Sequence, residues 1–465
     1  MLELFLLPVA IGAAAAMFPG PKNNDRKKIE TLYKKIGFAL PPSSKDGKPE
    51  YPRFKKKMTI MNGEEQIGMR YLYTVPLGLA PSILVKAEEN LHYFRDGMNH
   101  PVVVEFRRIT EDKKDPAYDP KKYMMVSVFE NDIPTMFPYS DCPAVKDEWK
   151  IPLGKTLEGI VWLNFDHIPH MTIAGVTRFG KTVFLKVLMT YLISNHPDDA
   201  EFYIIDLKGG LEFSQYAELP QVKGRVAGDY MEAFMMALGL HNLLNQDLKF
   251  FKAHGIRNIV NSKIKKRRFI IVDEAAQLAA EKFMTQKVKD IPEIQPYMDL
   301  LPKNVQTGTQ KDMMNYTQYL LSEIARLGGA LGYRLIYCTQ YPTADTLPRQ
   351  IKMNSDAKLT YRLPTGYASE VAIDTRGAEE LPSGIKGRAL YKTHDLTEMQ
   401  TPLLEDKDMW KILSRFRVPR LKGEKGNGNG KNKTNRKARR NFEFTGPPAV
   451  CNTGTASNNP SIRDE

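Results

Sequence analysis

Cysteine is scarce in this sequence. Its three cysteines, Cys142, Cys338 and Cys451, lie far apart, and no C-x-x-C pair occurs. Disulfide frameworks and zinc sites both need cysteines at short, regular spacings, so the sequence indicates neither of them. We therefore expect the protein to work in a reducing compartment.

Acidic residues are too few to balance the basic ones. Lys and Arg number 67 against 54 Asp and Glu, which gives a net charge of +13. Such an excess favours an anionic partner, either nucleic acid or the anionic face of a membrane. Part of the excess lies in the C-terminal tail, so the charge alone does not choose between these partners.

Long apolar runs are also rare, and the main one is residues 2–19, interrupted only by Glu3. Its length is near the lower limit for a membrane-spanning helix. A secretory signal carries its basic residues before the apolar core, but here they follow it, as Lys22, Arg26, Lys27 and Lys28. The positive-inside rule then places the rest of the chain in the cytoplasm. We expect a single-pass anchor over residues 1–19 in the cell membrane; the alternative is a cleaved signal or a peripheral segment.

The central feature of the sequence is GVTRFGKT, residues 175–182, which fits the phosphate-binding pattern G-x-x-x-x-G-K-[ST]. An apolar run at 171–174 predicts a buried strand before it, and apolar residues at helical spacing over 182–193 predict a helix after it. The amides at the start of that helix would face the phosphates of ATP. Lys181 would reach the β- and γ-phosphates, and the Thr182 hydroxyl would bind Mg²⁺. The predicted ATP cradle comprises Gly175, Val176, Thr177, Arg178, Phe179, Gly180, Lys181 and Thr182.

Two further strands are predicted to end in polar groups beside this loop. The apolar run 269–272 precedes Asp273 and Glu274. Asp273 would hold Mg²⁺, directly or through water, and Glu274 would polarise the water that attacks the γ-phosphate. The strand at 334–338 leads to Gln340, which would contact the γ-phosphate or the attacking water; the alternative is an ordinary polar residue at a strand end.

The order of elements predicts an α/β fold. From residue 151 on, apolar strands alternate with helical stretches: strands at 201–205, 268–272, 334–338 and 359–363, and helices at 229–251 and 316–330. This alternation is typical of a P-loop NTPase, a RecA-like parallel sheet with helices on both faces. Ligands of such sheets bind at the carboxyl ends of the strands, where the loop lies.

The P-loop ATPase domain is predicted to span residues 151–415, with different segments on either side. Residues 20–150 read as a small α+β membrane-proximal domain with no catalytic constellation. Its expected elements are helices at 27–38 and 87–94 and strands at 69–75, 102–109 and 123–129. Residues 416–465 read as a basic tail, which is too polar to fold by itself from residue 420 on.

Several motifs together carry a family resemblance. They are PHMTIAGVTRFGKT, IIDLKGG, HGIRNIVN, IIVDEAAQL and GGALGYRLIYCTQYPTAD, spread over residues 151–391. In this order and spacing they resemble the FtsK/SpoIIIE family of DNA-pumping motors, and most of all the coupling proteins of conjugative elements. The resemblance implies a ring, usually a hexamer, that hydrolyses ATP while moving DNA through its centre. It also implies work at the inner face of the plasma membrane with conjugation pore and relaxase proteins.

The resemblance also implies an arginine that reaches the γ-phosphate bound by a neighbouring subunit. Family members often carry it where this chain has Gly329. Arg326 lies one turn earlier on the same helix face and is the expected substitute, with Arg349 and Arg376 as rivals. The sequence shows no winged-helix reader or long linker of the cell-division members, which argues against chromosome segregation.

Two other functions stay open at this point. Related FtsK-like ring ATPases drive protein secretion, although these typically carry several motor domains in tandem and only one phosphate loop is present here. A nucleotide-dependent assembly factor that turns over slowly is the third, weaker possibility. Stimulation of ATP hydrolysis by DNA would separate the first function from the others.

Overall fold

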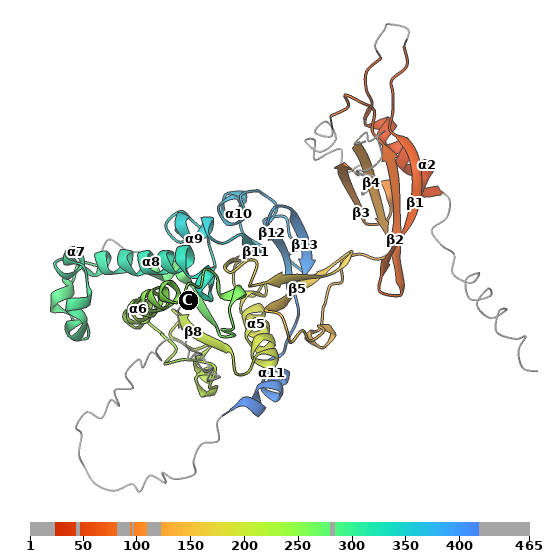
Figure 1. The fold of residues 1–465 in the computed structure, drawn as a ribbon. Coiled ribbons are helices and arrows are strands. Elements are labelled where there is room, and N and C mark those ends of the chain that lie inside the picture. Colours follow the sequence, from red (N-terminus) through yellow and green to blue (C-terminus); the bar gives the residue numbers. More distant parts are fainter. Residues whose placement is uncertain are drawn as a thin grey trace, which may run out of the picture. The chain divides into compact units, whose positions relative to one another are not determined.

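The structure is a computed structural model that describes residues 24–42, 47–80, 94, 97–108, 122–279 and 284–417. These residues form two compact units (Figure 1). The N-terminal unit takes the described residues up to Pro134 together with Lys155–Gly159. The C-terminal unit takes Thr135–Gly154 and the described residues from Ile160 on.

The N-terminal unit is a helix packed on an antiparallel sheet. The sheet has the order β1-β2-β4-β3, and each neighbouring pair is antiparallel. Its elements are α2 Asn24–Lys35, β1 Arg53–Asn62, β2 Glu65–Thr74, β3 Val102–Arg108 and β4 Lys122–Phe129. Ile29 and Tyr33 of α2 pack against Tyr71 and Tyr73 of β2 and Val126 of β4.

Three strands of this unit were predicted, whereas β1 was not. Strand β1 lies at the sheet edge and carries Lys55, Lys56 and Lys57 on a largely exposed surface. Lysines on an edge strand discourage pairing with other chains, and they also hide the alternation that identifies a strand. The helix expected at 87–94 falls outside the described residues, except for Phe94.

The C-terminal unit is built on a nine-stranded sheet with the order β6-β5-β13-β12-β11-β7-β10-β9-β8. Its strands are β5 Lys150–Thr156, β6 Gly159–Asn164, β7 Met171–Ala174, β8 Ala200–Asp206, β9 Arg267–Asp273, β10 Tyr333–Thr339, β11 Ala357–Tyr361, β12 Arg388–Lys392 and β13 Leu396–Gln400. The five strands from β11 to β8 are parallel, as predicted.

The sheet as a whole is mixed, so the predicted parallel sheet describes only the part from β11 to β8. Strand β12 runs antiparallel to both β11 and β13. Only Thr393, His394 and Asp395 separate β12 from β13, and so short a connection joins antiparallel strands, because a parallel pair needs a crossover of a dozen or more residues.

Helices cover both faces of this sheet (Figure 1). α5 Lys181–Asn195 and α11 Asp406–Leu413 pack on one face, and α6 Tyr230–Ala253 and α8 Gln310–Leu327 pack on the other. The remaining helices are α7 Lys303–Gln306, α9 Arg349–Met353 and α10 Gly366–Ile373. Strand β9 is therefore buried on both of its faces. Phe269 and Ile271 face the α5 side, whereas Ile270 and Val272 face the α6 side. A strand buried on both faces is apolar throughout, so its functional groups lie at its end.

Helix α8 begins earlier and ends earlier than predicted. The Thr309 side chain accepts from the third helical amide while Asp312 accepts from the Thr309 amide, which forms a capping box. The helix ends at Leu327, and a 3₁₀ turn over Gly329–Leu331 leads to β10.

Among the described residues, no helix is long and apolar enough to cross a membrane. The anchor expected at residues 1–19 and the disorder expected from residue 420 on both lie outside the described residues.

Candidate functional site

The phosphate loop joins β7 to α5 through a backbone that needs its glycines. Gly175 and Gly180 have φ values of 153° and 121°, which glycine adopts readily and other residues do not. A Cβ on Gly175 would lie 2.6 Å from the Cβ of Tyr361, and one on Gly180 would lie 3.2 Å from the Cα of Gly387. Arg178 also has a positive φ, 73°. The pattern G-x-x-x-x-G is thus a steric requirement of this turn.

Helix α5 starts directly after this turn and leaves its first amides available. Gly180 is the N-cap residue and offers no side chain to satisfy them. Unpaired amides and the positive end of the helix dipole together favour a phosphate at this position. Thr182, in the first turn, lines the adjoining cavity.

Lys181 is buried and already faces two carboxylates. Its Nζ lies 2.5 Å from Oδ1 of Asp273 and 3.9 Å from Oε2 of Glu274. Burial lowers the pKa of Lys181, but the Asp273 carboxylate and neighbouring groups outweigh burial and hold that pKa above its ordinary value. The ammonium group therefore remains charged, and phosphate oxygens would compete with Asp273 for it.

Asp273 ends strand β9 and fits the metal role predicted for it. The residue is fully buried, and its Oδ2 has no hydrogen-bond partner. Leaving a buried acceptor unpaired costs about 1–3 kcal/mol, so a cation at this oxygen would be stabilising. No three His, Cys, Asp or Glu side chains among the described residues gather into a metal site. Mg²⁺ is held by one or two protein oxygens plus substrate phosphates, so the unpaired oxygen of Asp273 would suit it.

Glu274 follows Asp273 in a strained backbone conformation. Its φ and ψ are 58° and 52°, the left-handed region that a non-glycine residue occupies only at a cost. The side chain is buried, and its Oε2 lies 3.4 Å from Nζ of Lys208. Two lysines, Lys181 and Lys208, thus flank this carboxylate.

Asp206 and Lys208 belong to this site, although the sequence analysis gave them no role. Asp206 ends β8 directly beside Asp273 in the sheet register, and its carboxylate accepts from the amides of Lys208 and Glu212 at 3.2 and 3.1 Å. Burial raises the pKa of Asp206, these amides lower it, and Asp273 raises it further. The signal that could have revealed the pair is IIDLK, an apolar run ending in an acid like the run before Asp273.

A cavity of about 810 Å³ opens over the phosphate loop. Gln340, at the end of β10, lines it beside Lys181 and Lys208, so the structure brings the predicted polar group to the phosphate end. The remaining wall is contributed by residues distant from the loop in the sequence, namely Thr135, Met136, Gly384, Ile385, Lys386, Gly387, Gln400, Thr401, Pro402 and Leu403. Apolar side chains in that wall suit a nucleotide base, and the sequence analysis did not find them.

Comparison with known proteins shows which family this domain resembles. Residues 143–343 match the family model described as FtsK/SpoIIIE family, and the match includes the phosphate loop, Asp273, Glu274 and Gln340. Over these residues the chain is similar to the FtsK/SpoIIIE family. The domain is therefore of the P-loop ATPase type.

The chain is similar to curated DNA translocases over part of their length. It is 27% identical over 278 residues to DNA translocase FtsK of Leptospira interrogans, covering 58% of this chain and 27% of that protein. DNA translocase FtsK of Lactococcus lactis subsp. lactis is 26% identical over 273 residues, 57% of this chain and 33% of that protein. The chain thus spans about a third or less of these relatives.

A solved structure shares the fold over most of the chain. The pCW3 conjugation coupling protein TcpA, in a monomer form with ATPgS, matches with a TM-score of 0.53 and 20% identity. The match covers 84% of this chain and 99% of that chain.

Three arginines were predicted as candidates for a neighbour's site, and each lies apart from this domain's own cavity lining. Arg326 on α8 has a side chain 52% exposed and pairs with Glu323 at 2.6 Å. Arg376 is also exposed and pairs with Glu370 at 2.8 Å, while Arg349 begins α9 on the surface. A role for any of them in a neighbouring subunit's site stays a prediction.

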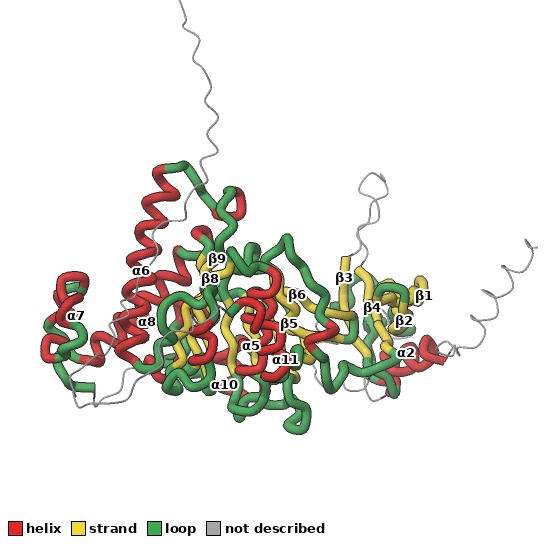
Figure 2. The backbone as a smooth tube through the Cα atoms, turned by 90° about the horizontal axis from the view of Figure 1, so that it is seen from below, coloured by secondary structure: helices red, strands yellow, loops and turns green. Residues whose placement is uncertain are grey.

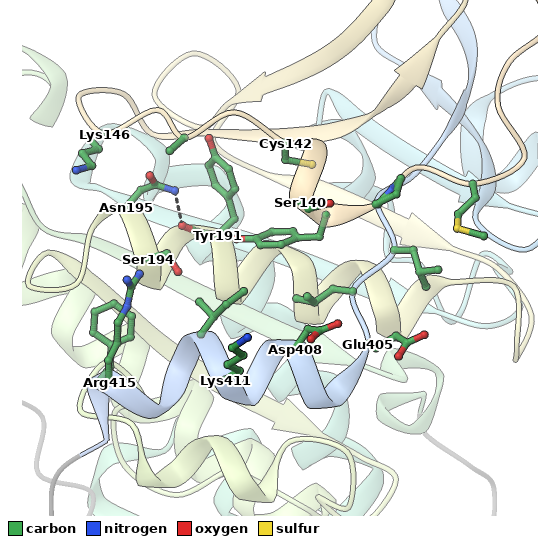
Figure 3. Close-up of a pocket in the computed structure, with 18 residues that line it drawn as sticks. Ser140, Cys142, Lys146, Tyr191, Ser194, Asn195, Glu405, Asp408, Lys411 and Arg415 are labelled. Carbon is green, nitrogen blue, oxygen red and sulfur yellow. Dashed lines mark hydrogen bonds between the residues drawn. The ribbon is translucent and has the colours of Figure 1, made fainter.

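A larger hollow of about 950 Å³ in the same unit has a structural role (Figure 3). The Tyr191 hydroxyl on α5 donates to the Pro143 carbonyl at 2.7 Å and accepts from the Val145 amide at 3.0 Å. Asn195 donates to the Tyr191 carbonyl at 2.8 Å. Burial raises the pKa of Cys142 to about 12, so its thiol stays protonated. These polar groups hold the segment before β5 against α5.

Proposed function

We propose that the protein is an ATP-driven DNA translocase, anchored at the inner face of the cell membrane and serving as the coupling protein of conjugative transfer. The observation that carries the ATPase part is the buried group of Lys181, Asp273 and Glu274 at the carboxyl ends of two parallel strands. One cation for phosphate, one carboxylate for a metal and one for water are the parts that phosphoryl transfer needs.

The residues of the chain divide the work as follows. The free amides at the start of α5 bind the phosphates, and Lys181 exchanges its contact with Asp273 for the γ-phosphate. Glu274 accepts hydrogen bonds from the attacking water and draws off its proton. Thr182 and Asp273 would hold Mg²⁺, which neutralises phosphate charge when bound. Gln340 would sense whether a γ-phosphate is present.

The DNA part of the proposal is supported by the family and by the charge. The chain has a net charge of +13, which suits a polyanionic substrate. The conjugative part is supported by how much of each relative the chain matches. The structural match covers 99% of the coupling protein TcpA, whereas the sequence match covers only 27% of the Leptospira translocase. A protein built like a coupling protein would act beside relaxase and pore proteins.

A ring, most simply a hexamer, would complete the site. Arg326 is exposed and does not line the cavity of its own subunit, so its guanidinium is available to a neighbour's γ-phosphate. In such a ring, hydrolysis in one subunit responds to the position of the next.

The experiment is steady-state ATPase measurement with and without DNA of arbitrary sequence, at two salt concentrations, on residues 20–465 and 20–419. We expect DNA to stimulate hydrolysis several-fold in both versions, with the stimulation fading as salt rises, because contacts to phosphates release counterions. The longer version should bind DNA more tightly without turning over faster. Absence of stimulation in a demonstrably oligomeric sample would contradict the proposal and favour a protein-secreting ring.

A further inference from the structure

The end of helix α6 and the loop after it carry an unbalanced positive charge. Residues 249–268 contain eight Lys and Arg residues and no Asp or Glu. Figure 2 shows this end of α6 and its loop standing at the margin of the C-terminal unit, above β8 and β9. The loop leads into the first residue of β9, whereas Asp273 is its last. A seven-residue strand is roughly 20 Å long, so this surface is separate from the nucleotide cavity.

Three of the eight cations are structural. Lys266 pairs with Glu201 at 3.0 Å. Arg267 is bound to Asp166 at 2.8 Å, and Arg268 to Asp247 at 2.6 Å. These ion pairs stabilise the start of β9. The acids that form them, Glu201, Asp166 and Asp247, are therefore already paired.

The other five cations are exposed and free of such pairs. They are Lys249, Lys252, Arg257, Lys263 and Lys265, and we call them the α6-loop cations. None of them makes a salt bridge with any residue that the structure describes. Five like charges gathered at the end of α6 and on the loop after it repel one another, so an anionic partner would relieve a repulsion that no acid among the described residues compensates by a salt bridge.

The loop is also hollowed, with polar donors along the hollow. Its volume is about 510 Å³, and Arg257 and Lys263 line it together with Asn258 and Asn261. The rings of Phe250 and His254, whose centroids lie 4.1 Å apart, form one wall. Cations, amides and rings in one groove are the groups that contact sugar-phosphate backbones and bases.

We propose that the α6-loop cations form a docking surface for the phosphate backbone of DNA, separate from the nucleotide site. This inference rests on the proposed DNA translocase function and names residues that hold its substrate. A lipid surface fits less well, because membrane-binding segments combine basic residues with apolar side chains that insert. Val260 is the only exposed large apolar residue among the described residues of this loop.

The test compares two triple variants of the full chain, purified in a non-ionic detergent. One is Lys252→Gln, Arg257→Gln and Lys263→Gln. The matched control is Lys287→Gln, Lys303→Gln and Lys311→Gln, which removes the same charge from exposed lysines elsewhere in the C-terminal unit. Fluorescence anisotropy with a labelled duplex of random sequence gives the Kd at several salt concentrations.

We expect the loop variant to bind at least about tenfold more weakly at moderate salt, while the control binds like the unmodified protein. The slope of log Kd against log salt should fall by about 0.9 for each phosphate contact removed, hence by about 2 to 3. Thermal unfolding midpoints equal to that of the unmodified protein show that all three proteins are folded.

The outcomes separate the two proposals. If the unmodified protein binds DNA but the loop variant keeps its affinity and salt slope, the docking surface is wrong and the translocase proposal stands. If the unmodified protein binds no DNA, both fall. A loop variant that keeps DNA binding but loses binding to phosphatidylglycerol vesicles would show the partner to be a membrane and overturn the inference.

Discussion

At the residue scale, the site is dominated by a lysine that pairs with the carboxylate proposed to hold a metal. Lys181 and Asp273 are both buried and 2.5 Å apart. A buried charge without a partner is very costly, so each residue stabilises the other until phosphate and metal arrive. Glu274 makes no pair as close as that one, since its nearest cation, Lys208, is 3.4 Å away, and we propose that its carboxylate acts on water.

Glu274→Gln tests whether Glu274 is needed for hydrolysis but not for nucleotide binding. The amide keeps the shape of the side chain but loses its basicity, so we expect nucleotide binding to persist and hydrolysis to fall at least ~10²-fold. Equilibrium binding of a fluorescent ATP analogue and steady-state turnover measure the two properties. Lost binding with a high residual rate would instead make Glu274 a metal ligand or a structural residue.

Lys208 is predicted to position Glu274. Its Nζ lies 3.4 Å from the Glu274 carboxylate, and small misplacements of a catalytic group can cost up to ~10²-fold. We expect Lys208→Ala to lower kcat about tenfold with little change in nucleotide affinity. Lys208→Arg keeps a cation and should recover most of the rate. A raised KM with unchanged kcat would show that Lys208 binds the nucleotide instead.

At the scale of elements, the phosphate loop depends on space beside β11. Gly175→Ala would place its Cβ 2.6 Å from the Cβ of Tyr361 and strain a φ of 153°, so we expect lower stability and loss of nucleotide binding. Gly384→Ala, on the same cavity, meets nothing within 4 Å and is the matched control. The thermal unfolding midpoint, measured with and without nucleotide, reports both stability and nucleotide binding. Equal midpoints for the two variants would mean that the loop can move away from Tyr361.

The junction between the loop before β7 and strand β10 should be sensitive to acid. Burial and the nearby Arg334 lower the pKa of His170 to about 3, and its Nδ1 accepts from the Leu335 amide at 2.9 Å. The folded pKa lies below the ordinary value of about 6.5, so the unfolded chain takes up the proton first. Stability therefore falls as the pH drops below 6.5, by about 1.4 kcal/mol per pH unit.

Urea unfolding at pH 7 and pH 5 measures this effect. His170→Asn keeps an acceptor near the position of Nδ1 and removes the titration. Between these pH values we expect its free energy of unfolding to fall by about 2 kcal/mol less than that of the unmodified protein. His196 and His241, whose pKa values burial also lowers, are present in both proteins and cancel. An identical loss in both would refute the role of His170.

Sequence predicted the elements whose signals are local. The strand, loop and helix around Lys181 lie together in the sequence, and so do the apolar run and the acids at Asp273. The antiparallel strands of the sheet and the part of the cavity wall after residue 383 were missed, because they depend on contacts between segments far apart in the chain. The role of Asp206 was missed as well, because its neighbour across the sheet, Asp273, becomes adjacent only after folding.

At the scale of the whole molecule, residues 1–19 are predicted to hold the motor at the membrane. A version lacking them should stay in the supernatant after high-speed centrifugation of lysed cells and still hydrolyse ATP, because the segment carries no catalytic group. It should fail to support DNA transfer between cells. Recovery of the intact protein in the same supernatant, without detergent, would rule out the anchor.

The strand order also fixes when the large sheet can be completed during synthesis. β13 and β12 lie between β5 and β11, so β5 waits for strands that begin only at Arg388. At ~5–20 residues per second, the ribosome needs roughly ten to fifty seconds to reach them. β5 presents an unpaired edge throughout that interval, and β11 presents one from its own synthesis until β12 follows. Unpaired edges are the kind of surface that recruits other chains. The nascent protein is therefore a natural client for chaperones until its last hairpin closes the gap.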